Sequence, residues 1–175
     1  MHAFYTIGHS TRSIRAFVDL LRAGAVAEVV DIRTVPRSRT NPHYNEEALP
    51  AALAPYGISC RRIAALGGLR GRARDVPPET NGWWENRSFH NYADHALAAA
   101  FAAGLDELVA AGRAAPVAMM CSEAVWWRCH RRIVADWLLA RGATVLHLMD
   151  GPRLDPATLT PAARVGPGGV VTYPA

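Results

Sequence analysis

The chain has 175 residues, of which 50% are hydrophobic and 19% charged, and its formal net charge is +4. These values suit one folded domain with a substantial core and exclude a disordered chain, which would be poorer in apolar residues. The longest run free of strongly polar residues, 96–105, is far shorter than the roughly 20 residues of a membrane span, so we expect a cytoplasmic protein with no membrane partner.

The first half of the chain alternates short β-rich runs with helical patterns. Three strands are predicted, over residues 3–7, 28–32 and 58–63. Ser13 is placed to cap a helix that stops at Gly24, and a second helix is predicted over residues 46–56. Residues 64–88 are irregular, and segments of that length inside a compact domain usually serve as lids or binding loops.

The second half continues the alternation and ends in a tail. Helices are predicted over residues 90–111 and 126–140, and strands over residues 116–121 and 143–149. The whole pattern predicts a single α/β domain, with a mostly parallel five-stranded sheet and helices on both faces. We expect this domain to span residues 1–151, with the Pro/Gly-rich residues 152–175 packed on it or trailing from it.

Polar and reactive residues follow every predicted strand. In order along the chain these are Gly8-His9-Ser10, Asp31 with Arg33, Gly67-Gly68, Cys121-Ser122-Glu123 and Asp150-Gly151. Ligands of open α/β folds bind beyond the carboxyl ends of the strands. The sequence therefore predicts one site at this rim of the sheet.

The basic residues suggest an anionic ligand. All 19 are arginine, and residues 33–74 contain eight of them against only two acidic residues. Arginine holds phosphate and carboxylate oxygens in two-point contacts, which favours an anion as the ligand. A solvated surface loop would have the same composition, so the alternative stays open.

Cys121 is the candidate nucleophile because it ends a predicted central strand just before a helix. Backbone N–H groups and the helix dipole lower the pKa of a thiol in that position. Phosphate-loop thiol enzymes place an arginine six residues after the cysteine, whereas Arg128 is seven residues on. A small buried side chain is the alternative role. The odd number of cysteines argues against a disulfide framework.

His130 falls on the apolar stripe of the predicted helix 126–140, as either a core residue or a site residue. Glu123 lies directly after the strand, where it could act as a general base or orient an arginine. Cys121, Cys129 and His130 are the ligands if a metal binds, but their spacing matches no zinc knuckle. No metal or other cofactor is therefore assigned.

Two other segments could contribute to binding. Asp31 and Arg33 share one side of their strand, and a structural ion pair is the alternative to a catalytic role for Asp31. Backbone N–H groups and the hydroxyl at His9 and Ser10 could hold an anion. Residues 83–92 place aromatic side chains beside arginine, as base stacking requires, although packing onto the core would use the same residues.

These motifs together resemble the DUF488 family of bacterial and archaeal proteins, over roughly residues 6–147. The resemblance rests on Thr6-Ile7-Gly8-His9-Ser10, Asp31-Ile32-Arg33 with Pro36 and Ser38, Leu66-Gly67-Gly68, Phe89 with Tyr92-Ala93, Met120-Cys121-Ser122-Glu123 and Cys129-His130-Arg131. Cys-Ser-Glu stands here in place of Cys-Ala-Glu, and Trp126-Trp127 replaces a stretch that often contains proline. The resemblance implies a compact α/β domain with the motif residues in one unit, and it supplies no reaction.

Three functions remain open at this stage. The first is an enzyme acting on a phosphate-bearing nucleotide or nucleic acid. Its catalytic residues would be Cys121, Glu123, His130 and Asp31, and its anion-binding residues His9, Ser10, Arg33 and Arg131. The second is a non-catalytic nucleic-acid or nucleotide-binding module that uses residues 33–74 and 83–92. The third is a metal-binding or thiol-redox protein. The oligomeric state is not predicted.

Overall fold

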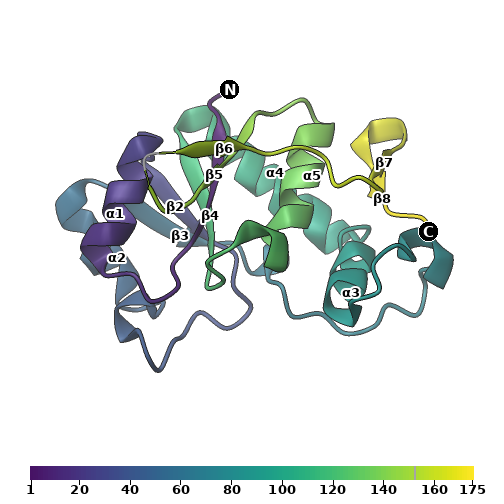
Figure 1. Ribbon diagram of the computed structural model, residues 1–175, viewed down its shortest axis with the longest axis horizontal. Coiled ribbons are helices and arrows are strands. Elements are labelled where there is room, and N and C mark those ends of the chain that lie inside the picture. The colour runs from purple at the N-terminus through teal and green to yellow at the C-terminus, as the bar shows by residue number, and fades with distance from the viewer. Residues whose placement is uncertain (152) are drawn as a thin grey trace.

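A computed structural model describes residues 1–151 and 153–175, so Pro152, the first residue of the predicted tail, lies outside the described part. Its centre is a six-stranded sheet in the order β3-β2-β4-β1-β5-β6 (Figure 1). The strands are β1 Phe4–Gly8, β2 Glu28–Asp31, β3 Ser59–Arg62, β4 Val117–Cys121, β5 Val145–Leu148 and β6 Leu154–Pro156. The first five strands pair in parallel, and β6 pairs antiparallel with β5.

The predicted α/β class and mostly parallel sheet are confirmed, but the predicted number of five strands is wrong. The sixth strand, β6, has only three residues and ends in proline. Such a short strand shows no alternation that a sequence pattern could reveal. Because proline cannot donate to a ladder, this segment is compatible only with an edge position.

Helices cover both faces of the sheet. The α-helices are α1 Ile14–Ala23, α2 Leu49–Leu53, α3 Arg87–His95, α4 Ala99–Ala114 and α5 Arg131–Ala140. Helices α1 and α2 pack on one core with residues such as Ile7, Phe17 and Leu53. Helices α4 and α5 pack on the other core, which contains Phe101 and Ile133. Short 3-10 turns lie at Pro42–Tyr44, Ala54–Tyr56, Ala64–Leu66, Pro78–Asn81, Trp126–Arg128 and Pro167–Gly169.

Two of the predicted helices are interrupted. The predicted helix 90–111 consists of α3 and α4, which meet at an angle of 79°. No glycine or proline lies at the break, residues 96–98, and the bend instead allows Tyr92 and Phe101 to pack edge to face in one core. Among the described residues, no single helix is both long and apolar enough to cross a membrane, and α3 and α4 reach that length and composition only when counted together.

The predicted helix 126–140 begins five residues late, at Arg131, after a 3-10 turn at Trp126–Arg128. The apolar stripe of the predicted helix 126–140 includes Trp127, but this prediction is wrong, because the side chain lies before α5 and is 46% exposed. His130 precedes the first turn of α5 instead of lying within the helix. The predicted helix 46–56 is likewise shortened to α2 and a 3-10 turn.

The described part of the tail folds back onto the domain. Strands β7 Arg164–Val165 and β8 Val171–Thr172 form a hairpin, and Tyr173 beyond it is buried. The hydroxyl of Tyr173 donates to a carboxylate oxygen of Asp136 on α5 at 2.8 Å. Its backbone N–H donates to the side-chain oxygen of Asn81 at 3.0 Å. The tail therefore joins α5 to the irregular segment before α3.

Candidate functional site

The ends of three adjacent strands meet beneath a cavity of about 390 Å³. Strand β4 lies between β1 and β2, and its last residue, Cys121, pairs with Gly8 of β1. Asp31, the last residue of β2, pairs with Met120. The parallel register therefore brings the segments that follow these strands to one edge, as the rule for open α/β sheets predicts.

The loop after Cys121 is held by a buried arginine. Arg131 has no exposed surface, and its guanidinium donates to the carbonyls of Glu123 at 2.7 Å and Ala124 at 3.1 Å. Gly8 lies directly against the Glu123 carbonyl, which a Cβ at that position would overlap. These contacts fix the path of the backbone from β4 towards the 3-10 turn that precedes α5.

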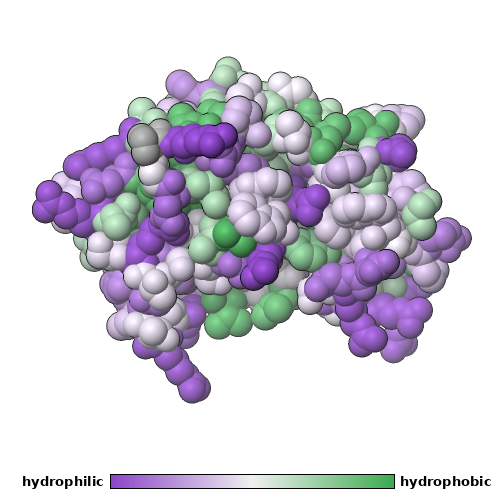
Figure 2. Space-filling view, viewed as in Figure 1, coloured by the Kyte–Doolittle hydropathy of each residue, from purple (hydrophilic) through white to green (hydrophobic). Residues whose placement is uncertain are grey.

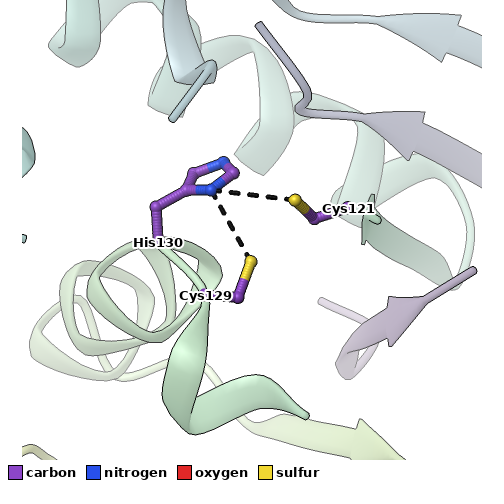
Figure 3. A group of neighbouring side chains, drawn as sticks. All are labelled: Cys121, Cys129 and His130. Atoms are coloured by element: carbon purple, nitrogen blue, oxygen red, sulfur yellow. Dashed lines mark hydrogen bonds between the residues drawn. The ribbon is translucent and has the colours of Figure 1, made fainter. Parts of the chain in front are cut away.

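The sulfur atoms of Cys121 and Cys129 both contact one nitrogen of His130 (Figure 3). The distances to Nδ1 are 3.9 Å from Cys121 and 3.6 Å from Cys129. The other ring nitrogen, Nε2, lies 2.8 Å from the carbonyl oxygen of Ile32. Because a carbonyl only accepts, Nε2 carries the proton in the neutral ring, and the lone pair of Nδ1 faces the two thiols.

The surroundings of Cys121 favour its thiolate. A hydrogen bond from Cys129 is the largest influence that lowers the Cys121 pKa, and it outweighs the opposing effect of burial. Hydrogen bonding to His130, its charge and the backbone N–H of Glu123 lower the Cys121 pKa further. Burial raises the pKa of Cys129, and it raises that of the third cysteine, Cys60, to about 12. Cys121 is thus the activated thiol of the three.

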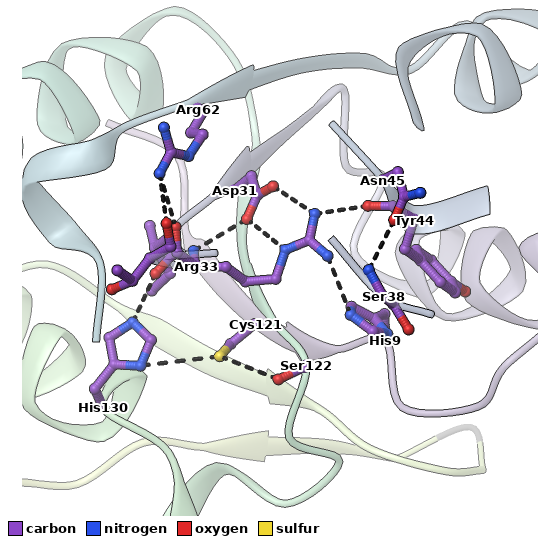
Figure 4. A network of polar contacts seen from close by, with 12 residues as sticks. His9, Asp31, Arg33, Ser38, Tyr44, Asn45, Arg62, Cys121, Ser122 and His130 are labelled. Atoms are coloured by element: carbon purple, nitrogen blue, oxygen red, sulfur yellow. Dashed lines mark hydrogen bonds and ion pairs between the residues drawn. The ribbon is translucent and has the colours of Figure 1, made fainter. Parts of the chain in front are cut away.

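Beside Cys121, Arg33 is the centre of a second polar network (Figure 4). Its guanidinium forms a two-point ion pair with Asp31, with N···O distances of 2.9 and 2.7 Å, and also donates to the Tyr44 carbonyl. The third nitrogen lies 3.3 Å from Nε2 of His9. Nδ1 of His9 donates to the Ser10 carbonyl, which leaves Nε2 as the acceptor for Arg33. Burial lowers the pKa of His9, so the ring stays neutral beside the arginine.

The cavity wall carries more positive than negative groups. Arg33, Arg37 and Arg128 line it together with a single carboxylate, Glu123. Arg37 pairs with Glu47 at 3.4 Å, but both side chains are largely exposed, so this pair is weak. The space-filling view shows hydrophilic and apolar groups interspersed over the face of the molecule that it presents (Figure 2). The lining as a whole is suited to an anionic ligand.

The loop after β3 closes the side of the cavity next to His130. Gly68 lies so close to the imidazole that a Cβ would overlap its ring atoms. The hydroxyl of Thr34 accepts a hydrogen bond from the Leu69 N–H at 2.8 Å, which holds this loop to the segment after β2. Tyr92 packs edge to face on the His130 ring and donates to the Leu66 carbonyl. The imidazole is therefore fixed on several sides.

The structure brings some of the predicted site residues together and separates others. Those that line the cavity are Cys121, Glu123, His130, His9 and Arg33. Asp31 does not line the cavity but orients Arg33 through their ion pair. The Ser10 carbonyl accepts a hydrogen bond from the His9 ring. Arg131, which is predicted to bind an anion, is fully buried and does not line the cavity, and its guanidinium donates to the loop carbonyls.

Several lining residues were not among the predicted catalytic or anion-binding set, namely Thr34, Arg37, Ser38, Gly68, Phe89, Arg128 and Cys129. The sequence predicts Cys129 as a ligand if a metal binds and places it in a helix, whereas α5 begins only at Arg131. Gly68 is predicted to lie at the rim only because it follows the third predicted strand. The remaining residues lie in irregular segments whose side-chain directions no periodicity indicates.

Several residues of the segments predicted for nucleic-acid binding are occupied by internal contacts, while others, such as Arg72 and Trp83, are exposed. Trp84 and Tyr92 belong to the core. Arg61 pairs with Glu28 at 2.6 Å, and Arg62 and Arg70 donate to backbone carbonyls. Phe89 remains available to a ligand, since it is half-buried and lines the cavity.

Cys121, Cys129 and His130 could also hold a metal ion, because their ligand atoms all lie within 4.8 Å of one another. The bond from Nε2 of His130 to a backbone carbonyl is the second contact that metal-binding histidines usually make. Such a site would have a fourth position open towards the cavity.

Fold and site together define a single-domain α/β protein with an activated cysteine at the carboxyl edge of its sheet. The chain belongs to the family described as domain of unknown function DUF488, whose model matches residues 13–138. The match includes Asp31, Cys121 and His130 but not the Gly8-His9-Ser10 segment. No curated protein and no solved structure matches the chain.

Proposed function

We propose that this protein is an enzyme that acts on a small phosphate-bearing substrate through the thiolate of Cys121. One observation carries the proposal: the Cys121 sulfur lies in an arginine-lined cavity, in contact with the unprotonated nitrogen of a fixed histidine. A cavity of about 390 Å³ is within the range of small-molecule sites. Nucleophile, base and orienting group are the parts that covalent catalysis requires.

The arrangement supports a two-step reaction. Nδ1 of His130 accepts the thiol proton, and the Cys121 thiolate attacks an electrophilic carbon or phosphorus of the substrate. A sulfur–substrate bond forms as the bond to the leaving group breaks, and Nδ1 returns the proton to that group. Water then cleaves the sulfur–substrate bond and restores the thiol. Glu123 is exposed at the cavity wall, where it can take a proton from this water.

Arg128 is the residue most free to bind the phosphate group. It is exposed at the cavity wall and forms no ion pair with the described residues, whereas Arg33 is bound to Asp31 and the exposed Arg37 forms a weak pair with Glu47. A guanidinium offers two parallel N–H groups to a phosphate. Arg33 then serves mainly to keep positive charge beside the Cys121 sulfur, with Asp31 holding its direction.

Protection from alkylation tests both parts of the proposal. Iodoacetamide should label Cys121 at neutral pH much faster than Cys60, and inorganic phosphate should slow the labelling of Cys121. In Arg128→Gln the phosphate concentration needed for protection should rise about tenfold, as expected for the loss of one charged contact. Arg15→Gln changes an exposed arginine on α1 and is the matched control. In this variant, phosphate should protect Cys121 at the same concentration as in the wild type.

Turnover completes the test. The protein is mixed with each compound of a panel of nucleotides and sugar phosphates, quenched in acid, and its intact mass is measured. Compounds of the substrate class should leave a covalent adduct on Cys121. Cys121→Ser should form no adduct and turn over about 1,000-fold more slowly or worse. Full activity in Cys121→Ser, or labelling of Cys121 no faster than that of Cys60, would contradict the role of this thiol.

A metal centre is the second candidate, and a specific distance favours it. Tetrahedral zinc with Zn–S bonds of about 2.3 Å and a Zn–N bond of about 2.0 Å sets S···N distances of about 3.5 Å. The two S···N distances here are 3.6 and 3.9 Å. Metal analysis of untagged protein distinguishes the candidates: one equivalent of zinc that is lost in Cys129→Ser supports the metal centre, and its absence supports the free thiol.

A further inference from the structure

Cys121 and Cys129 approach each other from two different elements. Cys121 ends β4, and Cys129 lies just before α5. Both sulfurs contact Nδ1 of His130, and all three atoms lie within 4.8 Å of one another. Figure 3 shows the two thiols pointing towards the same side of the imidazole. They are therefore neighbours in space across a loop of seven intervening residues.

The two thiols are not equivalent. Both thiols line the cavity, but Cys121 is 9% exposed whereas Cys129 is only 4% exposed. The Cys121 sulfur is therefore the one that a small reagent in the cavity reaches more readily. The Cys129 sulfur lies within 4.8 Å of it, close enough to attack a group that is bonded to Cys121.

We propose that Cys121 and Cys129 form a reversible disulfide when the protein meets a peroxide. Cys121 is the thiol that is oxidised first, and Cys129 is the resolving thiol. The formation of this bond does not depend on the enzyme reaction proposed above. Only its consequence, the loss of the Cys121 nucleophile, rests on that reaction.

The chemistry balances with hydrogen peroxide as the oxidant. The Cys121 thiolate attacks one peroxide oxygen, the O–O bond breaks, and hydroxide leaves, so that Cys121 becomes a sulfenic acid. The Cys129 sulfur then attacks the Cys121 sulfur. The S–O bond breaks, the thiol proton of Cys129 passes through Nδ1 of His130 to the departing oxygen, and water leaves. Two electrons have moved from the thiol pair to the peroxide.

Arg131 holds the loop between the two cysteines at Glu123 and Ala124, so the short movement that bonding needs falls to the residues that follow. Trp127 and Arg128 are exposed there, and this part of the loop contains a 3-10 turn rather than a longer helix. Closing a loop of this length costs little conformational entropy, because the two sulfurs already lie near each other in the reduced protein. A peroxide has access through the cavity that Cys121 lines.

Cys60 provides an internal control. It lies on β3 and is half-buried, and burial raises its pKa to about 12, so its thiol remains protonated at neutral pH. A protonated thiol reacts slowly with peroxide. Any oxidation shared equally among the three cysteines would therefore reflect unfolding or a general exposure to reagent.

Peptide mapping tests the proposal directly, because trypsin cleaves after Arg128 and separates the two cysteines. The full-length protein is treated with hydrogen peroxide, blocked with iodoacetamide and digested without reducing agent. Wild type and Cys60→Ser should give peptide 114–128 linked to peptide 129–131, with the mass lowered by two hydrogen atoms. Dithiothreitol should release both peptides and restore rapid labelling of Cys121.

Cys129→Ser supplies the second variant. It should stop at the sulfenic acid, which dimedone traps on Cys121 in far greater amount than in the wild type. Equal dimedone labelling of both proteins with no linked peptide would overturn the proposal, as would a disulfide that joins Cys60 of two chains. One equivalent of bound zinc that prevents the link would overturn it as well. A link in a protein that turns over no phosphate ester would instead refute the proposed enzyme and leave the disulfide standing.

Discussion

A single imidazole determines what the two site thiols can do. His130 donates through Nε2 to the Ile32 carbonyl at 2.8 Å, so its Nδ1 lone pair is available only to Cys121 and Cys129. The ring has no freedom to exchange its two nitrogens, because Gly68 and Tyr92 contact it on other sides. Reactivity at this site is therefore a property of ring orientation as much as of the thiol itself.

We expect His130→Asn to slow the alkylation of Cys121 at neutral pH by about 100-fold, since the variant removes the proton acceptor and its charge. The measurement is the rate of iodoacetamide incorporation into peptide 114–128. Labelling of Cys60 in the same sample reports any general loosening. His2→Asn, at an exposed position, should leave both rates unchanged. An unaltered Cys121 rate in His130→Asn would show that this ring does not activate the thiol.

At the same scale, Asp31 matters because it neutralises a buried guanidinium. Asp31→Asn would leave Arg33, which is 4% exposed, without its carboxylate. Breaking a buried pair in this way costs about 3–5 kcal/mol of the free energy of unfolding, measured in urea. The control is Asp150→Asn, which removes an 88% exposed partner of Arg12 and should cost less than about 1 kcal/mol. Similar losses in both variants would contradict this interpretation.

At the scale of elements, the site is assembled where loops meet rather than within a helix or a strand. The loop after β3 presses Gly68 against the His130 ring, and the loop after β2 holds it there through Thr34. The loop after β4 is fixed from beneath by Arg131. Each loop is thus positioned by a residue of another element. We therefore expect a small change in one loop to alter the contacts of the two thiols.

Gly68→Ala tests this coupling, because its methyl group would overlap the His130 ring. We expect the displaced imidazole to lose its contact with Cys121, so alkylation of Cys121 should slow about tenfold or more. Gly71→Ala lies three residues along the same loop, where an added Cβ meets nothing within 4 Å. In that variant Cys121 should be alkylated at the same rate as in the wild type. Equal rates in the two variants would mean that the ring tolerates the shift.

At the scale of the whole molecule, the tail ties distant parts together. Tyr173 and the backbone N–H of Thr160 both donate to Asp136 of α5, at 2.8 and 2.9 Å, while Tyr173 also accepts the N–H of Trp83 through its carbonyl. Helix α5, which follows Cys129, and the segment before α3, the helix that carries Phe89, are therefore held by the same C-terminal segment. The stability that these hydrogen bonds provide depends on the protonation of the buried Asp136 carboxyl group.

Burial raises the pKa of Asp136 above its ordinary value of 3.8, so the folded protein binds this proton more tightly than the unfolded chain does. The carboxyl group therefore favours folding most below pH 3.8, and this contribution is lost as pH rises through the folded value. We expect the free energy of unfolding of the wild type, relative to Asp136→Asn, to fall over that interval. Asp19→Asn, an exposed position on α1, should show no such trend, and a rise with pH would contradict the assignment.

The local pattern of residues was sufficient for the class of fold. Apolar strands such as residues 117–121 are buried on both faces, and that burial shows directly as an unbroken apolar run. The position of the site at the carboxyl edge followed from the order of strands and helices alone. Helix boundaries were less accurate, because the break between α3 and α4 and the late start of α5 arise from packing against distant residues.

What the sequence alone determined was the α/β class, the family resemblance and the rim at which Cys121 and His130 lie. The tertiary structure alone decided which side chains face the cavity. It turned Arg131 inward, placed Asp31 behind Arg33 and brought Cys129 beside Cys121. The physical reason is that strand and helix patterns depend on neighbours along the chain, whereas the direction of a side chain in a loop is set by contacts between segments far apart in sequence.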